Sequence, residues 1–293
     1  DGATIRGIVF DGASEVADAI RIDDTVTGAP VVISGCTVRN YTNRFVYVSL
    51  SGKIESLTID DCIFIGADNS TTNKAIYASS AHTQVETLSV TNSAFLNFNT
   101  GSNYFFRINC GEELVLMPVV LIDHCTFYNC YDRRGVYLYN AGRSTIKNCI
   151  SAFSERRDDT KSFTAYGDES IVKNVISYNV DLYGSAPKEN IISKNPLFVD
   201  AENGNFQLYK DSPAVGAGDD GSDLGDPRWG VSTENAPVGE LPYECFKKPY
   251  SMSPTTHSVR ILWQTLDSNP SGTVYYGKTP DLGQKLTAET GSN

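Results

Sequence analysis

The sequence predicts an all-β protein: a right-handed parallel β-helix of about seven to eight coils, followed by the start of a β-sandwich. No segment has the long helical period of apolar residues that an amphipathic helix requires, whereas Gly, Asn, Asp, Ser and Thr are dense throughout. A short apolar pattern also recurs at intervals of 24 to 32 residues, as it does in solenoid proteins. Because amphipathic helices are absent, each repeat is expected to be one coil of a β-helix.

In each copy of the repeat an apolar residue is followed three positions later by a small residue, and usually by another apolar residue two positions after that. The seven copies begin at Ile5, Ile33, Ile59, Val90, Ile122, Ile146 and Val172. When the coils stack, one interior column is expected to contain Cys36, Cys62, Ser93, Cys125 and Cys149. Because a free cysteine behaves as a small hydrophobe, this column is interpreted as a packing device.

A turn slot precedes that column, where the backbone is expected to adopt the left-handed conformation that Gly, Asn and Asp tolerate. The slot contains Gly7, Gly35, Asp61, Asn92, His124, Asn148 and Asn174. His124 and Cys125, in the stretch LIDHCTFYNC, are therefore interpreted as scaffold rather than as a catalytic pair. No Ser-His-Asp arrangement can be built from spacing, and no HExxH or Cys/His ligand set is present.

A second short strand in each coil alternates apolar and polar residues, so its polar residues are expected to point outward. The first outward column, named the strip here, contains Arg21, Tyr47, Tyr77, Arg107, Tyr137 and Thr164. The second outward column contains Asp23, Ser49, Ser79, Asn109, Tyr139 and Tyr166. With coils about 4.8 Å apart, the strip would be roughly 24 Å long, enough for several sugar units.

Tyrosine and arginine suit a carbohydrate surface, because rings offer flat faces to sugars and guanidinium groups donate hydrogen bonds to carboxylates. We therefore predict that the chain binds a polysaccharide, with Arg107 between Tyr77 and Tyr137 at the centre. The predicted contacts also include Arg21, Tyr47, Asn109, Tyr139 and Tyr166. Tyrosine and threonine stabilise any exposed sheet face, which is the purely structural interpretation.

Two other functions stay open. The first is a polysaccharide lyase acting by β-elimination on a uronic-acid polymer, in which Arg107 and Tyr137 would abstract the C5 proton and neutralise the carboxylate. The second is a structural stalk or adhesin that displays an enzyme domain beyond Asn293.

Charge and hydropathy exclude some partners. The net charge of −11 argues against a nucleic-acid surface, and no apolar run reaches the roughly 18 residues of a membrane helix. Asp1 is not an initiator Met, so an upstream segment is expected. The acidic loop around Asp219, Asp220, Asp223 and Asp226 lacks EF-hand spacing and is expected to be a capping turn. The prediction is no cofactor, with calcium as the alternative.

Two segments resemble known families. The tail NPLFVDAENGNFQLYKDSPAVGAG, with LGDPRW after it, and the coil VLIDHCTFYNCYDRRGVYLYNAGRSTIKNCI resemble the pectate-lyase-like β-helix proteins of polysaccharide-degrading bacteria. This resemblance implies the β-helix fold and an extracellular or bacterial cell-surface location. The catalytic signatures of the lyases, and the paired-aspartate and Gly-His-Gly motifs of polygalacturonases, are not matched.

Three parts are expected along the chain: a β-helix with its capping tail over residues 1–230, a linker over 231–253, and a second domain over 254–293. The segment SVRILWQTLDSNPSGTVYYG resembles the start of a fibronectin type III-like sandwich, in particular the small domain that precedes the catalytic domain of purple acid phosphatases. An Ig-like sandwich takes about 100 residues, so a further C-terminal part is expected after Asn293. No metal-ligand motif of those phosphatases is present.

Overall fold

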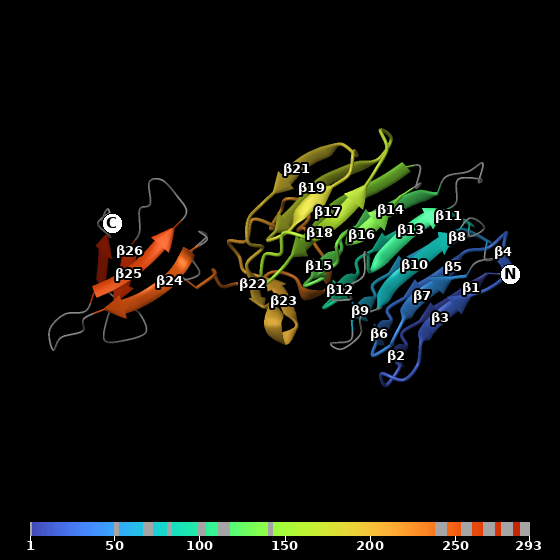
Figure 1. The fold of residues 1–293 in the computed structure, drawn as a ribbon, viewed down its shortest axis with the longest axis horizontal. Coiled ribbons are helices and arrows are strands. Elements are labelled where there is room, and N and C mark those ends of the chain that lie inside the picture. The colour runs from blue at the N-terminus through green and yellow to red at the C-terminus, as the bar shows by residue number, and fades with distance from the viewer. Residues whose placement is uncertain are drawn as a thin grey trace. The chain divides into compact units, whose positions relative to one another are not determined.

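The structure is a computed structural model, and it describes residues 2–49, 53–66, 73–80, 84–98, 104–110, 118–139, 143–237, 245–252, 260–265, 273–276 and 284–287. The chain forms two compact units, Asp1–Ala236 and Pro237–Asn293, which are described separately. The first unit is a parallel β-solenoid, so the predicted fold class is confirmed. In Figure 1 its strands stack in sequence order, from blue in the first coil to yellow in the last.

Two parallel sheets, of 14 and seven strands, form the solenoid. The first row of the 14-stranded sheet contains β1 (Ala3–Arg6), β5 (Val31–Ser34), β8 (Lys53–Asp60), β11 (Gln84–Thr91), β14 (Val119–Asp123), β17 (Arg143–Ala152), β19 (Ile171–Tyr178) and β21 (Lys188–Ile192), with β4 (Thr25–Val26) on β8. Its second row contains β2 (Val9–Asp11), β6 (Thr37–Arg39), β9 (Ile63–Ile65), β12 (Ala94–Leu96) and β15 (Thr126–Tyr128). The seven-stranded sheet contains β3 (Asp18–Ile22), β7 (Arg44–Val48), β10 (Lys74–Ser80), β13 (Phe106–Cys110), β16 (Val136–Leu138), β18 (Lys161–Ala165) and β20 (Asp181–Tyr183).

The solenoid has about five turns, which is fewer than the seven to eight coils predicted. Coils that contain β1 to β16 supply three separate strands each, whereas the two rows run together in β17 and β19. The sequence repeat continues through these merged strands, so counting repeats gives more coils than complete three-strand turns.

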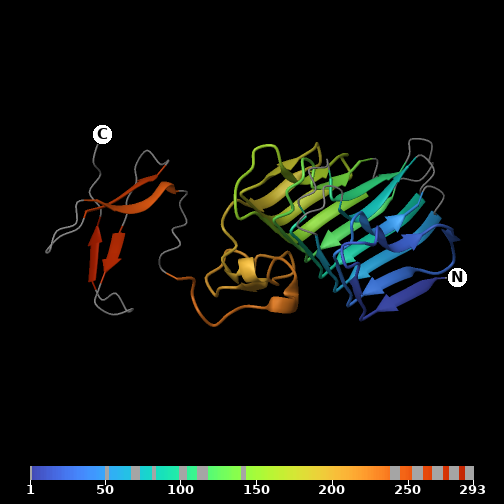
Figure 2. The same cartoon turned by 60° about the horizontal axis from the view of Figure 1, so that its bottom comes forward.

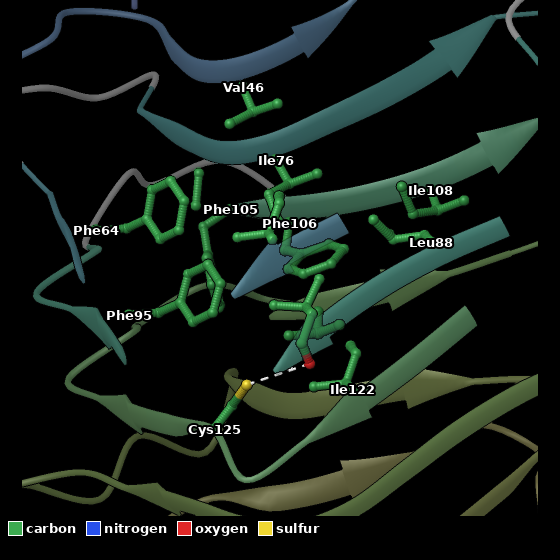
Figure 3. Packing of buried hydrophobic residues seen from close by; sticks show 14 of the residues in the cluster. Val46, Phe64, Ile76, Leu88, Phe95, Phe105, Phe106, Ile108, Ile122 and Cys125 are labelled. Carbon is green, nitrogen blue, oxygen red and sulfur yellow. Dashed lines mark hydrogen bonds between the residues drawn. The ribbon is translucent and has the colours of Figure 1, made fainter. Parts of the chain in front are cut away.

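The interior columns pair in the predicted register. Ile33 pairs with Ile5 and Ile59, and the series continues through Val90 and Ile122. Cys36, Cys62, Cys125 and Cys149 are free, buried thiols, as predicted. The Cys125 Sγ atom lies 3.5 Å from the backbone carbonyl oxygen of Val90, and the dashed line in Figure 3 marks a hydrogen bond of this sulfur. Ile8 is the exception in this column: it is 45% exposed because no described coil precedes its own.

Stacked phenylalanine rings fill the interior beside this column. The ring centroid of Phe95 lies 5.0 Å from that of Phe64 and 4.9 Å from that of Phe127, with interplanar angles of 8°. Phe105 and Phe106 close the cluster from the preceding turn and from β13 (Figure 3). The parallel register sets this stack, because Phe64, Phe95 and Phe127 are direct strand partners.

The turn slot has the predicted left-handed backbone in every copy. Its φ angles lie between 48° and 65° at Gly7, Gly35, Asp61, Asn92, His124, Asn148 and Asn174. Side chains of the slot bind neighbouring coils: Asn92 Nδ2 donates to Asp60 Oδ1 at 2.9 Å, and Asn148 Nδ2 donates to Asp123 Oδ1 at 3.0 Å. The slot is thus a polar ladder along one corner of the solenoid.

The tail after β21 folds back onto the outer face of the second row. It contains the antiparallel strands β22 (Phe198–Asp200) and β23 (Asn205–Leu208) and the short 3-10 helices η1 (Ala201–Asn203) and η2 (Pro227–Trp229). Phe206 and Leu208 form a second apolar cluster with Leu96, Tyr128 and Ile150. Figure 2 shows this gold-to-orange segment beside the coils.

Charged residues anchor the same tail to the turn ladder. Asp219 forms ion pairs with Lys147 at 3.2 Å and Lys173 at 2.9 Å. Arg228 lies 3.1 Å from Asp61 and 2.8 Å from Asp226. The acidic loop therefore caps the corner of the coils, as predicted.

The second unit contains two antiparallel strand pairs. β24 (Cys245–Met252) pairs with β25 (Arg260–Thr265), and β26 (Thr273–Tyr276) pairs with β27 (Gln284–Thr287). The strands predicted around Ile261 and in TVYYG are present, whereas the predicted DSNPSG turn lies outside the described residues. β24 lies within residues 231–253, the segment predicted as a linker. Its register shifts on either side of Lys247, and Pro249 follows there, as is usual for proline in an irregular edge strand.

Candidate functional site

The strip forms with the register predicted from the sequence. Arg21 pairs with Tyr47, Tyr47 with Tyr77, Tyr77 with Arg107, Arg107 with Tyr137, and Tyr137 with Thr164. All six residues lie on consecutive strands of the seven-stranded sheet. Their apolar neighbours in each strand face the core, so the alternation that defined the strip is confirmed.

The strip is more enclosed than predicted. Tyr47 and Tyr137 are only 7% and 6% exposed, and Thr164 is fully buried. The Arg44 guanidinium lies 3.5 Å from the centroid of the Tyr47 ring, and the Tyr104 ring stacks on Tyr137 at 5.8 Å. Outward-facing side chains of this strip therefore pack against one another and against residues that come from the preceding turns.

A further column of side chains, which was not predicted, produces this enclosure. It lies three positions before the strip in each coil and is named the flanking column here; it contains Arg44, Lys74, Tyr104, Arg134 and Lys161. Its members recur with the same spacing as the strip, so the same search of the sequence could have found them. Arg44, Lys74 and Lys161 are the first residues of β7, β10 and β18, whereas Tyr104 and Arg134 lie just before β13 and β16.

The tyrosines form a continuous series of ring contacts. Centroid distances are 6.0 Å for Tyr47–Tyr77, 6.2 Å for Tyr77–Tyr104 and 5.8 Å for Tyr104–Tyr137. The series continues through Tyr139, at 5.7 Å from Tyr137, to Tyr166, at 5.6 Å from Tyr139. The predicted contact residues Tyr139 and Tyr166 therefore belong to the same surface as Tyr137, and Tyr139 is exposed.

Arg107 lies at the middle of this series and has a further partner, Tyr104, that was not predicted. Its guanidinium lies 4.5 Å from the Tyr104 centroid and 5.8 Å from the Tyr137 centroid, and its Nη1 donates a hydrogen bond to the Tyr104 hydroxyl. Tyr77 is the strand partner of Arg107 and also contacts the Tyr104 ring. Arg107 is therefore held between the rings of Tyr104 and Tyr137.

Charges at the two ends of the surface are neutralised within the protein. Arg21 pairs with Asp23 at 2.8 Å, and Arg44 pairs with Asp18 at 2.7 Å. At the other end Lys161 pairs with Asp181 at 3.2 Å. An anionic ligand at these ends would have to compete with internal carboxylates.

The centre is different. Within the described part of the chain, neither Arg107 nor Arg134 forms an ion pair. The Arg107 Nε and Asn109 Oδ1 atoms are buried and have no hydrogen-bond partner among the described residues. The Arg134 guanidinium lies 4.8 Å from the Tyr137 centroid. Two guanidinium groups without a described ion pair thus lie against the Tyr137 ring.

Two titrating groups beside the centre are shifted by their surroundings. Burial lowers the pKa of Lys74. The charges of Arg44 and Arg107 lower it further, whereas the charge of Asp132 works in the opposite direction. Burial also raises the pKa of Tyr104, although the charge of Arg107 works in the opposite direction. The Lys74 ammonium lies 5.8 Å from the Tyr77 centroid. The centre therefore adjoins an amine that is easier to deprotonate than an ordinary lysine.

The carboxylates Asp219 and Asp223 of the acidic loop are bound by other residues of the protein. Asp219 is engaged by Lys147, Lys173 and Asn148, and Asp223 accepts a hydrogen bond from the Gly216 N–H. Among the residues that the structure describes, no group of three or more His, Cys, Asp or Glu side chains is placed to hold a metal ion.

None of the described helices is long and apolar enough to cross a membrane.

Two family models match the solenoid. Residues 2–98 are similar to a domain of unknown function, DUF4957, and residues 120–229 to a second domain of unknown function, DUF5123. No curated protein matches the chain. The first match ends shortly after β12 and the second begins in β14, so Tyr104 and Arg107 lie between them. By these matches the solenoid is similar to two domain families joined along a single stack of coils.

Proposed function

We propose that the chain binds an anionic polysaccharide, of the polyuronate class, along the strip and the flanking column. The observation that carries this proposal is the pair Arg107 and Arg134, which form no ion pair with the residues that the structure describes and lie against Tyr104 and Tyr137. Guanidinium groups bind carboxylates through paired hydrogen bonds, and tyrosine rings pack against the faces of sugars. The overall charge of −11 makes a local anion-binding surface more selective, because the rest of the protein repels a polyanion.

The test is affinity electrophoresis of the whole chain in gels that contain polygalacturonate, a neutral glucan or dextran sulfate. The double variant Arg107→Ala/Arg134→Ala should lose most of its retardation by polygalacturonate. The matched control is Arg143→Ala, which removes an exposed cation that pairs with Glu169 on the other sheet. Equal retardation of wild type and double variant would refute the proposal. Equal retardation in dextran sulfate and polygalacturonate would reduce it to charge attraction alone.

A second candidate is β-elimination on the same polymer. Lys74 favours it, because an amine with a lowered pKa beside a carboxylate-binding centre has the properties of a general base. In the predicted scheme Arg107 and Tyr137 carried the reaction; in this version Arg107 would neutralise the carboxylate. A rise in absorbance near 235 nm with polygalacturonate, lost in Lys74→Met, would support the lyase. A flat trace with intact binding would leave a binding protein.

The resemblance of the coils to pectate-lyase-like surface proteins supports the same proposal and adds a location. On this basis we propose that the protein is exported to the bacterial cell surface, with a fibronectin type III-like domain after the solenoid. A stalk or adhesin without glycan affinity is the outcome in which none of the three gels retards the protein.

A further inference from the structure

His124, in the turn slot, makes side-chain contacts that the stacking of the coils does not require. His124 occupies the slot that neighbouring coils fill with Asn92 and Asn148, and its backbone has the same left-handed conformation. The asparagines bind residues of the turn ladder and, at Asn148, Asp219 of the tail. The longer imidazole contacts Asp123 with one nitrogen and the tail residue Ser222 with the other.

These contacts have the geometry of a nucleophilic triad. The Ser222 Oγ atom lies 2.6 Å from His124 Nε2, and His124 Nδ1 lies 2.8 Å from Asp123 Oδ1. A carboxylate on Nδ1 fixes the tautomer in which Nε2 can accept the serine proton. Ser222 is 98 residues from His124, so sequence spacing could not reveal this arrangement. Only the folding back of the tail brings the two together.

Neighbouring groups fix the carboxylate of this triad. Asn148 Nδ2 donates to Asp123 Oδ1 at 3.0 Å, and the Lys147 ammonium lies 3.3 Å from Asp123 Oδ2. The side chains of Asp123 and His124 are largely buried. Asp123 is therefore held in a fixed orientation, as a positioning residue for the imidazole must be.

A pocket of about 270 Å³ adjoins the triad. His124 and Ser222 both line it, and its apolar lining includes Ile150, Phe198, Phe206 and Leu224. The Asp223 N–H, the amide that follows the serine, makes no hydrogen bond within the described part of the chain. The same pocket is also lined by polar residues, among them Thr126 and Asp226. A pocket of this size with an apolar part suits a short acyl chain, and the free amide is the kind of donor that stabilises an oxyanion.

Asp220 competes for the serine proton. Its Oδ1 lies 2.5 Å from Ser222 Oγ and also accepts the Ser222 N–H at 2.9 Å. A hydroxyl carries one proton, so donation to Asp220 and donation to His124 exclude each other. Weakening the acceptor at position 220 should therefore increase the fraction of serine that donates to the imidazole.

We propose that Ser222, His124 and Asp123 form a serine nucleophile site that cleaves short-chain carboxylic esters. Ser222 Oγ forms a bond to the acyl carbon while its proton moves to His124 Nε2. The ester C–O bond then breaks, and the imidazole gives the proton to the departing alcohol. Water attacks the acyl-serine in the same way, so that one carboxylic acid is released and the hydroxyl is restored.

The experiment uses the whole chain with two probes: p-nitrophenyl acetate, and a fluorophosphonate that forms a Ser–O–P bond and releases fluoride. The catalytic variants are Ser222→Ala and His124→Asn; the latter inserts the residue that neighbouring coils carry in this slot, so the fold should be retained. The control is Ser154→Ala, which changes an exposed serine bound to Tyr131. Peptide mapping identifies the labelled residue, and melting temperature reports folding.

We expect the wild type to be labelled at Ser222 and to release p-nitrophenol, and both activities to be absent in Ser222→Ala. His124→Asn should slow labelling at least 100-fold. Asp123→Asn should slow the labelling rate constant at least 10-fold with little change in probe affinity, a split that a structural role would not give. Asp220→Asn should raise the labelling rate several-fold, and Ser154→Ala should behave as wild type.

An unlabelled wild type, or a label on another residue, would overturn the proposal. So would a folded His124→Asn variant that is labelled as fast as wild type. Loss of labelling in Asp220→Asn with retention in His124→Asn would assign the base to Asp220 and refute the triad. None of these outcomes bears on the strip, which lies on the other sheet.

Discussion

Removing the Phe95 ring should be among the most damaging single substitutions in the solenoid. Phe95 is fully buried, and its ring contacts those of Phe64, Phe127, Phe105 and Phe106 at centroid distances of 4.9 to 6.3 Å. Truncation of a buried phenylalanine to alanine typically costs about 3–5 kcal/mol, because apolar contact is lost and a cavity remains. Backbone ladders hold the stacked coils apart at fixed spacing, so the cavity should collapse little and the loss should lie at the upper end.

The assay is urea unfolding followed by circular dichroism. With a slope of about 3 kcal/mol per M, Phe95→Ala should lower the urea midpoint by more than about 1 M. Because solenoid contacts join only neighbouring coils, hydrogen exchange should rise first in β9, β12 and β15. The matched control is Tyr183→Ala, whose side chain is 56% exposed and whose loss should change stability by no more than about 0.5 kcal/mol. A Phe95→Ala midpoint equal to that of the control would refute the reasoning.

Three further predictions concern the thiols and the tail. Burial raises the pKa of Cys62 to about 12, and four other thiols are also buried, those of Cys36, Cys125, Cys130 and Cys149. All five should therefore resist Ellman's reagent in the native protein and react only after unfolding. Rapid reaction of these five thiols in the native protein would contradict the packing. Hydrogen bonds from Asn148, Lys173 and Lys147 lower the pKa of Asp219, so the stability that Asp219 contributes is present above about pH 4 and is lost as pH falls. Asp219→Asn should therefore have a lower melting temperature than the wild type at pH 7, and this difference should shrink towards pH 3. Burial raises the pKa of Asp226 to about 6, although the charge of Arg228 works in the opposite direction. Arg228→Ala should therefore lower the free energy of unfolding by about 3 kcal/mol at pH 7 and by less at pH 5, where the carboxyl gains a proton. An equal loss of melting temperature at both pH values would show that the carboxylate is not the cause.

Most of the solenoid could be predicted because its determinants are local and repeated. The pairing of Ile33 with Ile59, or of Tyr77 with Arg107, follows from patterns that a stacked coil must satisfy in register. The left-handed turns followed in the same way from residues such as Asn92 and Asn148, whose short polar side chains tolerate that backbone.

Three features were not predicted, for a different physical reason in each case. Tyr104 and Arg134 lie in turns, where side-chain direction has no fixed period, so the strip was predicted as more open than it is. The contact of Ser222 with His124 depends on where the tail folds back, and no local pattern encodes that position. β24 was not predicted, and its irregular pairing around Lys247 and Pro249 leaves no regular strand pattern in that segment.

The most direct test of the proposed function is calorimetric titration with oligogalacturonides of increasing length. If the strip binds a polyuronate across several coils, affinity should rise with chain length until the oligomer spans the strip and then level off. Arg107→Ala should weaken the longest oligomer about 10-fold or more, because one charge-assisted hydrogen-bonded pair is worth roughly 1.5–3 kcal/mol. Affinity that is independent of length, or unchanged in Arg107→Ala while Arg143→Ala also binds normally, would contradict the account.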